Sequence, residues 1–481
     1  MISKREERPA IMGGPKVRTI TFPSQDTIGP LEQDSVIRAL TGRLSGYQGN
    51  WSNHFYGGPF IQELEQKWRG YFRVKNAIPC NSATSGLQIA LGAIGIRPGD
   101  EVIVSPYSMT CSATAPLVWS GIPVFADIEP GQYCLDPVSV RSRITEKTKA
   151  IIVVDLFGQS HDVEAFNAIS RKFGIPVIVD SAQALGAKFP LSGPLNLPDR
   201  PEKSGHWRYH AGTGSTIGVY SFNFGKHITS GEGGMIVTED EGLAFRCRLL
   251  MNHAEAVIHD MRIPVPPIAR SAPQDMWGFN MRMTELSAAL LIPQLDRLGL
   301  LLQRRLNNVA YLESLIQGNG LPIAFPRPRA EGYSHVFYVH PMEWEREKAE
   351  GLNRELFVDA VKAELSPLEN RLDEGVPMGY GYITPIYLMP IFQKKVQADP
   401  RNVSYFPGSC PVCEETWANR LFLHRFIGPT AEGIGQTHIE DVALAFRKVW
   451  KHREALIKWD RSLYSEQRKS SHDGGTREKT S

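Results

Sequence analysis

A regular alternation of short apolar runs and amphipathic stretches, from about residue 75 to residue 240, most limits how this chain can fold. The apolar runs are rich in valine and isoleucine and have the length of buried strands. They are residues 101–107, 123–128, 150–158, 176–183, 217–223 and 233–239. Amphipathic stretches between them include residues 85–95 and 162–174, the second opening on Asp162, which can cap a helix. Such repeats form right-handed crossovers, so we predict an α/β fold with a mostly parallel sheet and ligands beyond the strands' carboxyl ends.

The rest of the chain predicts a second domain and a tail. Residues 284–316 have the pattern of one or two long helices leading out of the large domain. Residues 189–216 are rich in proline and glycine, which is typical of a surface excursion or lid. We predict a large domain over residues 12–295, a smaller C-terminal α/β domain over 296–460, and a disordered tail over 461–481, where the composition is polar.

Charge and cysteine usage exclude several classes of protein. The formal net charge of +2 gives no reason to expect nucleic acid or an anionic membrane as a partner. The 6 cysteines are scattered, which fits a reducing compartment better than a disulfide framework. The first residues lack the apolar core of a signal peptide, and no apolar run is long enough for a membrane helix. We therefore expect a cytoplasmic protein.

A lysine directly after a buried strand is the first candidate for chemistry. Lys226 stands in the segment 221–234, where the strand pattern gives way to a glycine-rich turn. An isolated lysine is usually a surface residue, and that reading stands beside the functional one. Burying a charged lysine costs free energy, and this cost is avoided when the amine forms an imine, as in enzymes that use pyridoxal phosphate (PLP).

Two further segments fit the same cofactor. In residues 81–91, small residues lead straight into a helix, so free backbone N–H groups and the positive end of the helix dipole can bind a phosphate dianion. The simpler alternative is an ordinary helix cap. Asp180 ends an apolar strand, where an unpaired carboxylate would be unfavourable. A protonated pyridine nitrogen would supply a partner, although Asp180 could also cap a helix.

Taken in this order, the motifs resemble the DegT/DnrJ/StrS family of sugar and aminocyclitol aminotransferases, over roughly residues 12–460. The family's Ser-Phe, Lys and Gly-Glu-Gly-Gly signature matches residues 221–234. The resemblance implies the PLP-dependent aminotransferase fold of type I, with Lys226 holding PLP as a Schiff base and Asp180 facing the ring nitrogen. Further cofactor contacts implied by the resemblance are Thr84, Ser85 and Ser221 at the phosphate, Gln183 at the ring's phenolic oxygen, and Asn280 at the phosphate of a partner subunit in a homodimer.

The resemblance also suggests the substrates. An amino group from glutamate or glutamine is expected to pass to a keto sugar or keto cyclitol. Tyr387 stands where relatives acting on nucleotide-linked sugars often have histidine, and tyrosine resembles the subset acting on scyllo-inosose-type cyclitols. Both acceptors stay open. Thr110 falls where relatives usually stack an aromatic ring on PLP, so Tyr107, Met109 or smaller groups must pack there.

Other readings are weaker on this sequence. A dehydratase branch of the same fold has histidine in place of the lysine, and Lys226 argues against it. A non-catalytic regulator that senses PLP or a sugar would not need an imine-forming lysine. An NAD enzyme would need a GxGxxG segment after the first strand, which is missing. The CPVC segment, residues 410–413, has the spacing of a redox or zinc pair but no supporting cluster, so packing is the favoured role and no metal is expected.

Overall fold

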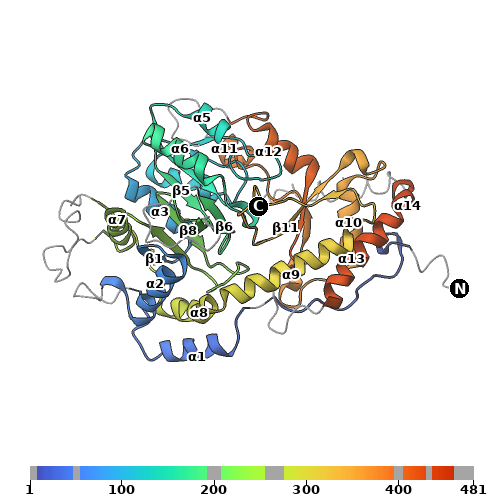
Figure 1. The fold of residues 1–481 in the computed structure, drawn as a ribbon, viewed down its shortest axis with the longest axis horizontal. Coiled ribbons are helices and arrows are strands. Elements are labelled where there is room, and N and C mark those ends of the chain that lie inside the picture. Colours follow the sequence, from blue (N-terminus) through green and yellow to red (C-terminus); the bar gives the residue numbers. More distant parts are fainter. Residues whose placement is uncertain are drawn as a thin grey trace, which may run out of the picture.

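A seven-stranded sheet lies at the centre of the larger part of the molecule (Figure 1). The computed structural model describes residues 8–25, 27–46, 55–191, 207–254, 276–394, 405–428 and 436–459. In spatial order the strands are β1 (Asn76–Cys80), β9 (Gly234–Thr238), β8 (Ile217–Ser221), β5 (Val177–Asp180), β4 (Thr148–Val154), β2 (Glu101–Val104) and β3 (Ile122–Phe125). β9 runs opposite to the other strands of this sheet, which are parallel to one another, so the predicted mostly parallel sheet is confirmed.

Helices cover both faces of this sheet, because the strands are apolar on both sides. Ile151 and Ile152 follow each other in β4 and belong to different core clusters, one on each face. The covering helices are α2 (Pro59–Phe72), α3 (Ala83–Ile94), α4 (Cys111–Thr114), α5 (Pro137–Arg143), α6 (Val163–Phe173) and α7 (Glu241–Met251). The predicted cap at Asp162 is confirmed, since its carboxylate accepts a hydrogen bond from the Ala165 N–H at the start of α6.

The predicted excursion at 189–216 begins and ends in a pair of antiparallel strands. These are β6 (Lys188–Leu191) and β7 (Trp207–His210). Residues 192–206 lie outside the described residues, and so do residues 461–481, for which a disordered tail is predicted. The interpretation of this stretch as a surface excursion or lid therefore stays a prediction.

The smaller part of the molecule is built on a four-stranded antiparallel sheet. Its spatial order is β10 (Ile323–Ala324), β11 (His340–Trp344), β13 (Leu421–His424) and β12 (Met378–Tyr380). Its helices are α10 (Arg354–Glu364), α13 (Gln436–Lys451) and α14 (Arg453–Lys458), whereas the short helices α11 (Pro390–Gln393) and α12 (Pro411–Glu415) place Phe392 and Cys413 in the core of the large sheet. No helix of the described residues combines the length and hydrophobicity needed to traverse a lipid bilayer.

Two consecutive helices connect the two sheets, as the pattern at 284–316 predicts. In Figure 1, α8 (Glu285–Asp296) lies beside the large sheet and α9 (Leu298–Ile316) continues to the smaller one. The helix α1 (Pro30–Ala39) packs against α8, and α9 packs against α13.

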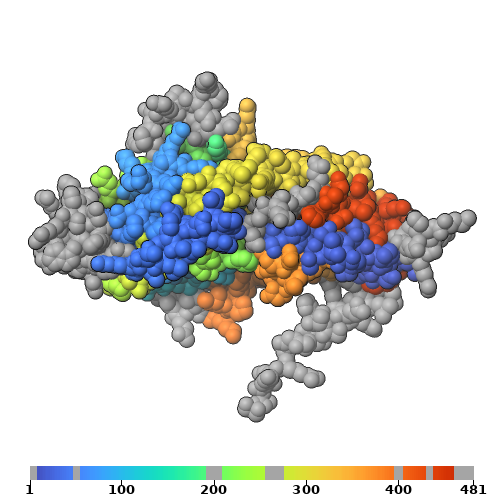
Figure 2. Space-filling view, turned by 90° about the horizontal axis from the view of Figure 1, so that it is seen from below, coloured from blue at the N-terminus to red at the C-terminus, as the bar shows by residue number. Residues whose placement is uncertain are grey.

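The N-terminal segment packs against the smaller part, although the sequence places residue 12 onward in the large domain. Arg18 Nη1 lies 2.7 Å from Asp441 Oδ2 of α13, and the ring centres of Phe22 and Phe426 are 4.5 Å apart. Figure 2 shows this blue segment beside the red helix α13. The burial of Phe22 in the smaller core explains the difference. The boundaries at 295 and 460 stay predictions.

Candidate active site

Lys226 lies in a tight loop that follows β8, at the carboxyl ends of the parallel strands. The Lys226 N–H donates to the Asn223 carbonyl at 3.0 Å, which closes the loop. Gly225 has a φ of +93°, and a Cβ there would lie 2.5 Å from Arg371 Nη2. Glycine is therefore required directly before the lysine. The Lys226 side chain is half-buried, with Nζ 4.3 Å from the centre of the Tyr338 ring.

Asp180 ends β5 as a buried carboxyl with a hydrogen-bond donor at each oxygen. Ser112 Oγ donates to Oδ2 at 2.7 Å, and the Ala182 N–H donates to Oδ1 at 3.1 Å. Burial raises the pKa of Asp180, while Ser112, Ala182 and the charge of Lys226 partly oppose the rise. Because a carboxylate can accept about four hydrogen bonds, both oxygens retain capacity for a ligand.

Gln183 hydrogen bonds with two residues of an aromatic wall of the site. Its Oε1 accepts from the Phe157 N–H at 2.9 Å, and its Nε2 donates to the Tyr382 hydroxyl at 3.0 Å. The Phe157 ring packs against Tyr382 and Tyr107, with ring centres 5.2 and 6.4 Å away. Tyr107 is fully buried in this wall, and its pKa is raised well above the usual value by that burial.

The N-terminus of α3 follows β1 at the same edge of the sheet. Ser82 caps this helix, its Oγ accepting from the Ser85 N–H at 3.1 Å and lying 2.9 Å from Ser85 Oγ. Thr84 is exposed in the first turn. Ser221, at the end of β8, is buried, with Oγ 3.3 Å from the Asn223 N–H. These positions leave the positive end of α3 available for an anion.

A chain of side chains connects the N-terminus of α3 to Asp180. The Cys111 thiol hydrogen bonds with Thr84 and Ser112, and Ser112 in turn donates to Asp180. Burial first, and then the charge of Asp180, raise the pKa of Cys111 to about 11, against the effects of Thr84, Lys226 and Ser112. Lys226, Asp180 and Thr84 thus belong to one cluster, in which Cys111 and Ser112 were not predicted.

Asn280 and Tyr387 are the two predicted residues that remain. Asn280 is exposed, in the segment whose Met281 carbonyl accepts from the Asn81 N–H at 2.9 Å, just before α3. The Tyr387 ring is buried against Phe125, with centres 5.6 Å apart, and its hydroxyl hydrogen bonds with Glu414. The predicted role of Tyr387 at the substrate is therefore not supported by a contact with Lys226, and it stays a prediction.

The CPVC segment starts the short helix α12. Cys410 and Cys413 are buried and free, and the N–H groups of Val412 and Cys413 donate to the Asp127 carboxylate at 2.8 and 3.0 Å. The Asp127 carboxylate thus caps the start of α12, and the two cysteine side chains pack in the core.

The residues present fit PLP. An amine, a buried carboxyl and a helix N-terminus face the same edge of the sheet, and they match its aldehyde, its ring nitrogen and its phosphate in charge and hydrogen bonding. Fold and site define a PLP-dependent aminotransferase of fold type I. More specifically, the chain belongs to the DegT/DnrJ/EryC1/StrS aminotransferase family, whose model matches residues 47–427.

Individual relatives are similar over most of this chain. It is 30% identical over 469 residues to L-glutamine:2-deoxy-scyllo-inosose aminotransferase from Streptomyces paromomycinus, covering 93% of this chain and 98% of that protein. It is 31% identical over 379 residues to a pleiotropic regulatory protein from Geobacillus stearothermophilus, covering 78% and 86%. The crystal structure of DesV from S. venezuelae is 26% identical with a TM-score of 0.64, covering 86% and 93%.

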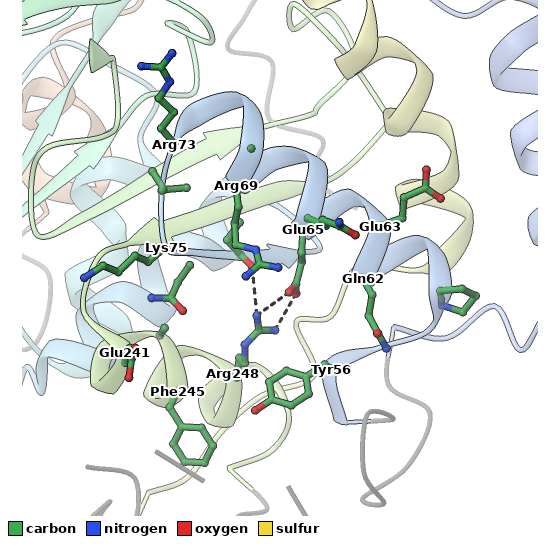
Figure 3. Close-up of a pocket in the computed structure, with 17 residues that line it drawn as sticks. Tyr56, Gln62, Glu63, Glu65, Arg69, Arg73, Lys75, Glu241, Phe245 and Arg248 are labelled. Atoms are coloured by element: carbon green, nitrogen blue, oxygen red, sulfur yellow. Dashed lines mark hydrogen bonds and ion pairs between the residues drawn. The ribbon is translucent and has the colours of Figure 1, made fainter. Parts of the chain in front are cut away.

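A hollow of about 1200 Å³ lies elsewhere, between α2 and α7, and none of the predicted cofactor residues lines it (Figure 3). Within it Arg248 makes two hydrogen bonds of 2.8 Å to the carboxylate of Glu65, and both side chains are 10% exposed. Arg248 Nη2 also donates to the Ala77 carbonyl of the edge strand β1 at 3.3 Å. The pair thus ties α2, α7 and the sheet together.

Arg248→Met is expected to lower the free energy of unfolding by about 3–5 kcal/mol, because Glu65 is left as a buried charge without its partner. The double variant with Glu65→Met should recover most of this loss. Urea unfolding of both variants measures the difference. Lys348→Met, which breaks a surface pair with Glu345, should cost about 1 kcal/mol or less and serves as the control. An equal loss in the single and double variants would contradict the role given to the ion pair.

Proposed function

We propose that this enzyme transfers an amino group from glutamine or glutamate to a keto cyclitol or keto sugar, with Lys226 carrying PLP. The observation that supports this most is the cluster of Lys226, Asp180 and the N-terminus of α3 at one edge of the sheet. The similarity across nearly the whole chain to an aminotransferase named for L-glutamine and 2-deoxy-scyllo-inosose favours a cyclitol acceptor. A nucleotide-linked keto sugar is the second candidate.

Each predicted residue then has a task at the cofactor. PLP, when bound, supplies an aldehyde for the amine and a ring that withdraws electrons. Asp180 would hold a proton at the ring nitrogen, and Gln183 would contact the ring's phenolic oxygen. Residues that would hold the phosphate are Thr84, Ser85 and Ser221. Lys226, once released from the cofactor by the amino donor, would act as the base that moves a proton at the reacting carbon.

A homodimer in the cytoplasm completes the proposal. The exposed position of Asn280, next to the segment that leads into α3, supports a contact with the phosphate of a partner subunit. All 6 cysteines are free, which supports a reducing compartment.

Visible absorption spectroscopy with PLP is the experiment that tests this function. We expect added PLP to give the absorption band of a lysine-bound cofactor, and glutamine or glutamate to bleach it as the amino group is transferred. Adding 2-deoxy-scyllo-inosose should restore the band and yield an aminated cyclitol detectable by mass spectrometry. If only a nucleotide-linked keto sugar restores it, the acceptor is a sugar. If PLP gives a band that no amino donor changes, a PLP-sensing regulator explains the site better.

A further inference from the structure

An extended segment from the smaller part of the molecule reaches the site and ends at Tyr338. The Val336 N–H donates to the Gly158 carbonyl at 2.7 Å, and the Tyr338 N–H donates to the Phe157 carbonyl at 2.8 Å. This approach requires glycine at 158, because a Cβ there would lie 2.6 Å from the Phe337 nitrogen. The segment is therefore docked against the loop that follows β4, the same loop that Gln183 holds.

Tyr338 is held in place from several sides. The residue before it, Phe337, has a φ of +49°, a conformation that costs energy for a non-glycine residue and persists only when surrounding contacts enforce it. Arg305 Nη1 donates to the Phe337 carbonyl at 3.1 Å, and Arg425 Nη2 donates to the Tyr338 hydroxyl at 2.7 Å. The phenol is thus fixed in orientation before any ligand binds.

This fixed phenol meets the catalytic lysine. Lys226 Nζ lies 4.3 Å from the centre of the Tyr338 ring, over its negative face, where an ammonium group is attracted to the ring. The next residue, His227, places Nε2 3.2 Å from the Val336 carbonyl. Two consecutive residues of the lysine loop therefore contact the Tyr338 segment.

The Tyr338 phenol can interact with the Lys226 amine in both protonation states of the amine. Arg425 can only donate, so it occupies a lone pair of the phenol oxygen and leaves the phenol proton free. That proton can be donated to an uncharged amine, and the oxygen and ring face can bind an ammonium. Burial raises the pKa of Tyr338, but the charges of Lys226, Arg425 and Arg371 outweigh it and leave the pKa below 10.

We propose that Tyr338 is a positioning residue for Lys226, holding the amine at the mouth of the cofactor site through the face of its ring. The inference rests on the proposed function, since it assigns a task only if Lys226 carries PLP. Other titratable or charged groups around Lys226 are Asp180, Cys111 and His227, together with Arg425 at the Tyr338 hydroxyl and Arg371 beside Gly225. Tyr338 differs from them because it contacts the amine directly.

Two variants separate the hydroxyl from the ring. Tyr338→Phe keeps the ring face and removes the hydroxyl, whereas Tyr338→Leu removes both. Tyr405→Phe is the matched control, because the Tyr405 hydroxyl donates a hydrogen bond of 2.7 Å to the Pro123 carbonyl. The protonation of Lys226 is read in the cofactor-free protein, by trace acetylation at several pH values and mass spectrometry of the Lys226 peptide. It is read again in the PLP-loaded protein, from the pH dependence of the visible band.

We expect the midpoint of Lys226 labelling to fall by about one pH unit in Tyr338→Leu, by less in Tyr338→Phe, and not at all in the control. The visible band should titrate at a lower pH in the same order. Unchanged midpoints in both folded variants would overturn the inference while the proposed function stands. If the wild-type protein shows no PLP band, the proposed function fails, and the labelling of the cofactor-free protein still decides whether Tyr338 controls the amine.

Discussion

Replacing Lys226 by alanine is expected to lower turnover of the PLP-loaded protein by about 10⁴-fold. On the proposed function, alanine would remove the covalent hold on the cofactor, and it also removes the lysine amine that lies over the Tyr338 ring. Asp180 and the N-terminus of α3 are untouched, so PLP should still bind without its covalent link. Turnover is measured by the formation of 2-oxo acid from glutamine in a single-turnover reaction.

Chemical rescue distinguishes lost chemistry from lost structure in this variant. Ethylamine or methylamine fits the space left by the lysine side chain and should restore part of the rate as a replacement base. The control is Lys348→Ala, which removes a 69% exposed lysine side chain of the smaller part and should leave turnover unchanged. Turnover of Lys226→Ala near the wild-type rate would mean that another group moves the proton, and the proposed mechanism would be wrong.

The sequence predicts that residues at the ends of the parallel strands lie close together, because the carboxyl ends of parallel strands meet at one edge of the sheet. Lys226 and Asp180 were predicted on this ground, and they lie in one electrostatic cluster. The strand β1 was not predicted. It has few branched residues and contains Pro79, which lacks an N–H and is tolerated because β1 is at the edge of the sheet.

Side chains that reach the site by tertiary contact could not be predicted. Tyr338 is far from Lys226 in the sequence, and its approach depends on the close contact between Gly158 and Phe337, which only the folded structure shows. Ser112 lies in a short helix after β2, and only the folded structure shows that its hydroxyl reaches Asp180. The Tyr387 ring is buried against Phe125, and its role at the substrate stays a prediction.

Lowering the pH from 7.5 to 5 is expected to destabilise the fold through its buried histidines, with a loss of about 2 kcal/mol from His335 alone. Burial lowers the pKa of His335 to about 3, and that of His227 and His424 well below 6.5. Unfolded histidine has a pKa near 6.5, so the unfolded chain takes up protons below that pH while the folded chain does not. The stability is therefore complete above pH 6.5 and is lost as the pH falls toward the folded values.

Carboxyl groups shift the net effect but not its direction in this window. The pKa of buried Asp180 is raised, so its protonation favours the folded state on acidification and offsets part of the loss. Glu313 has a lowered pKa despite its burial, because His340 and Arg327 bind its carboxylate, and its contribution is lost only below its unfolded pKa of 4.5. The contribution of a histidine to the pH dependence of stability is therefore best measured with a variant that removes the histidine and keeps its hydrogen bond.

His335→Asn supplies that comparison. His335 Nδ1 accepts from the Phe337 N–H at 2.9 Å, and the side-chain oxygen of asparagine can accept the same bond but cannot titrate. Urea unfolding at pH 7.5 and 5 should show that the variant loses about 2 kcal/mol less than the wild-type protein over this range. An equal loss in both proteins would mean that His335 is protonated in the folded state, and that the segment leading to Tyr338 opens to solvent before the protein unfolds.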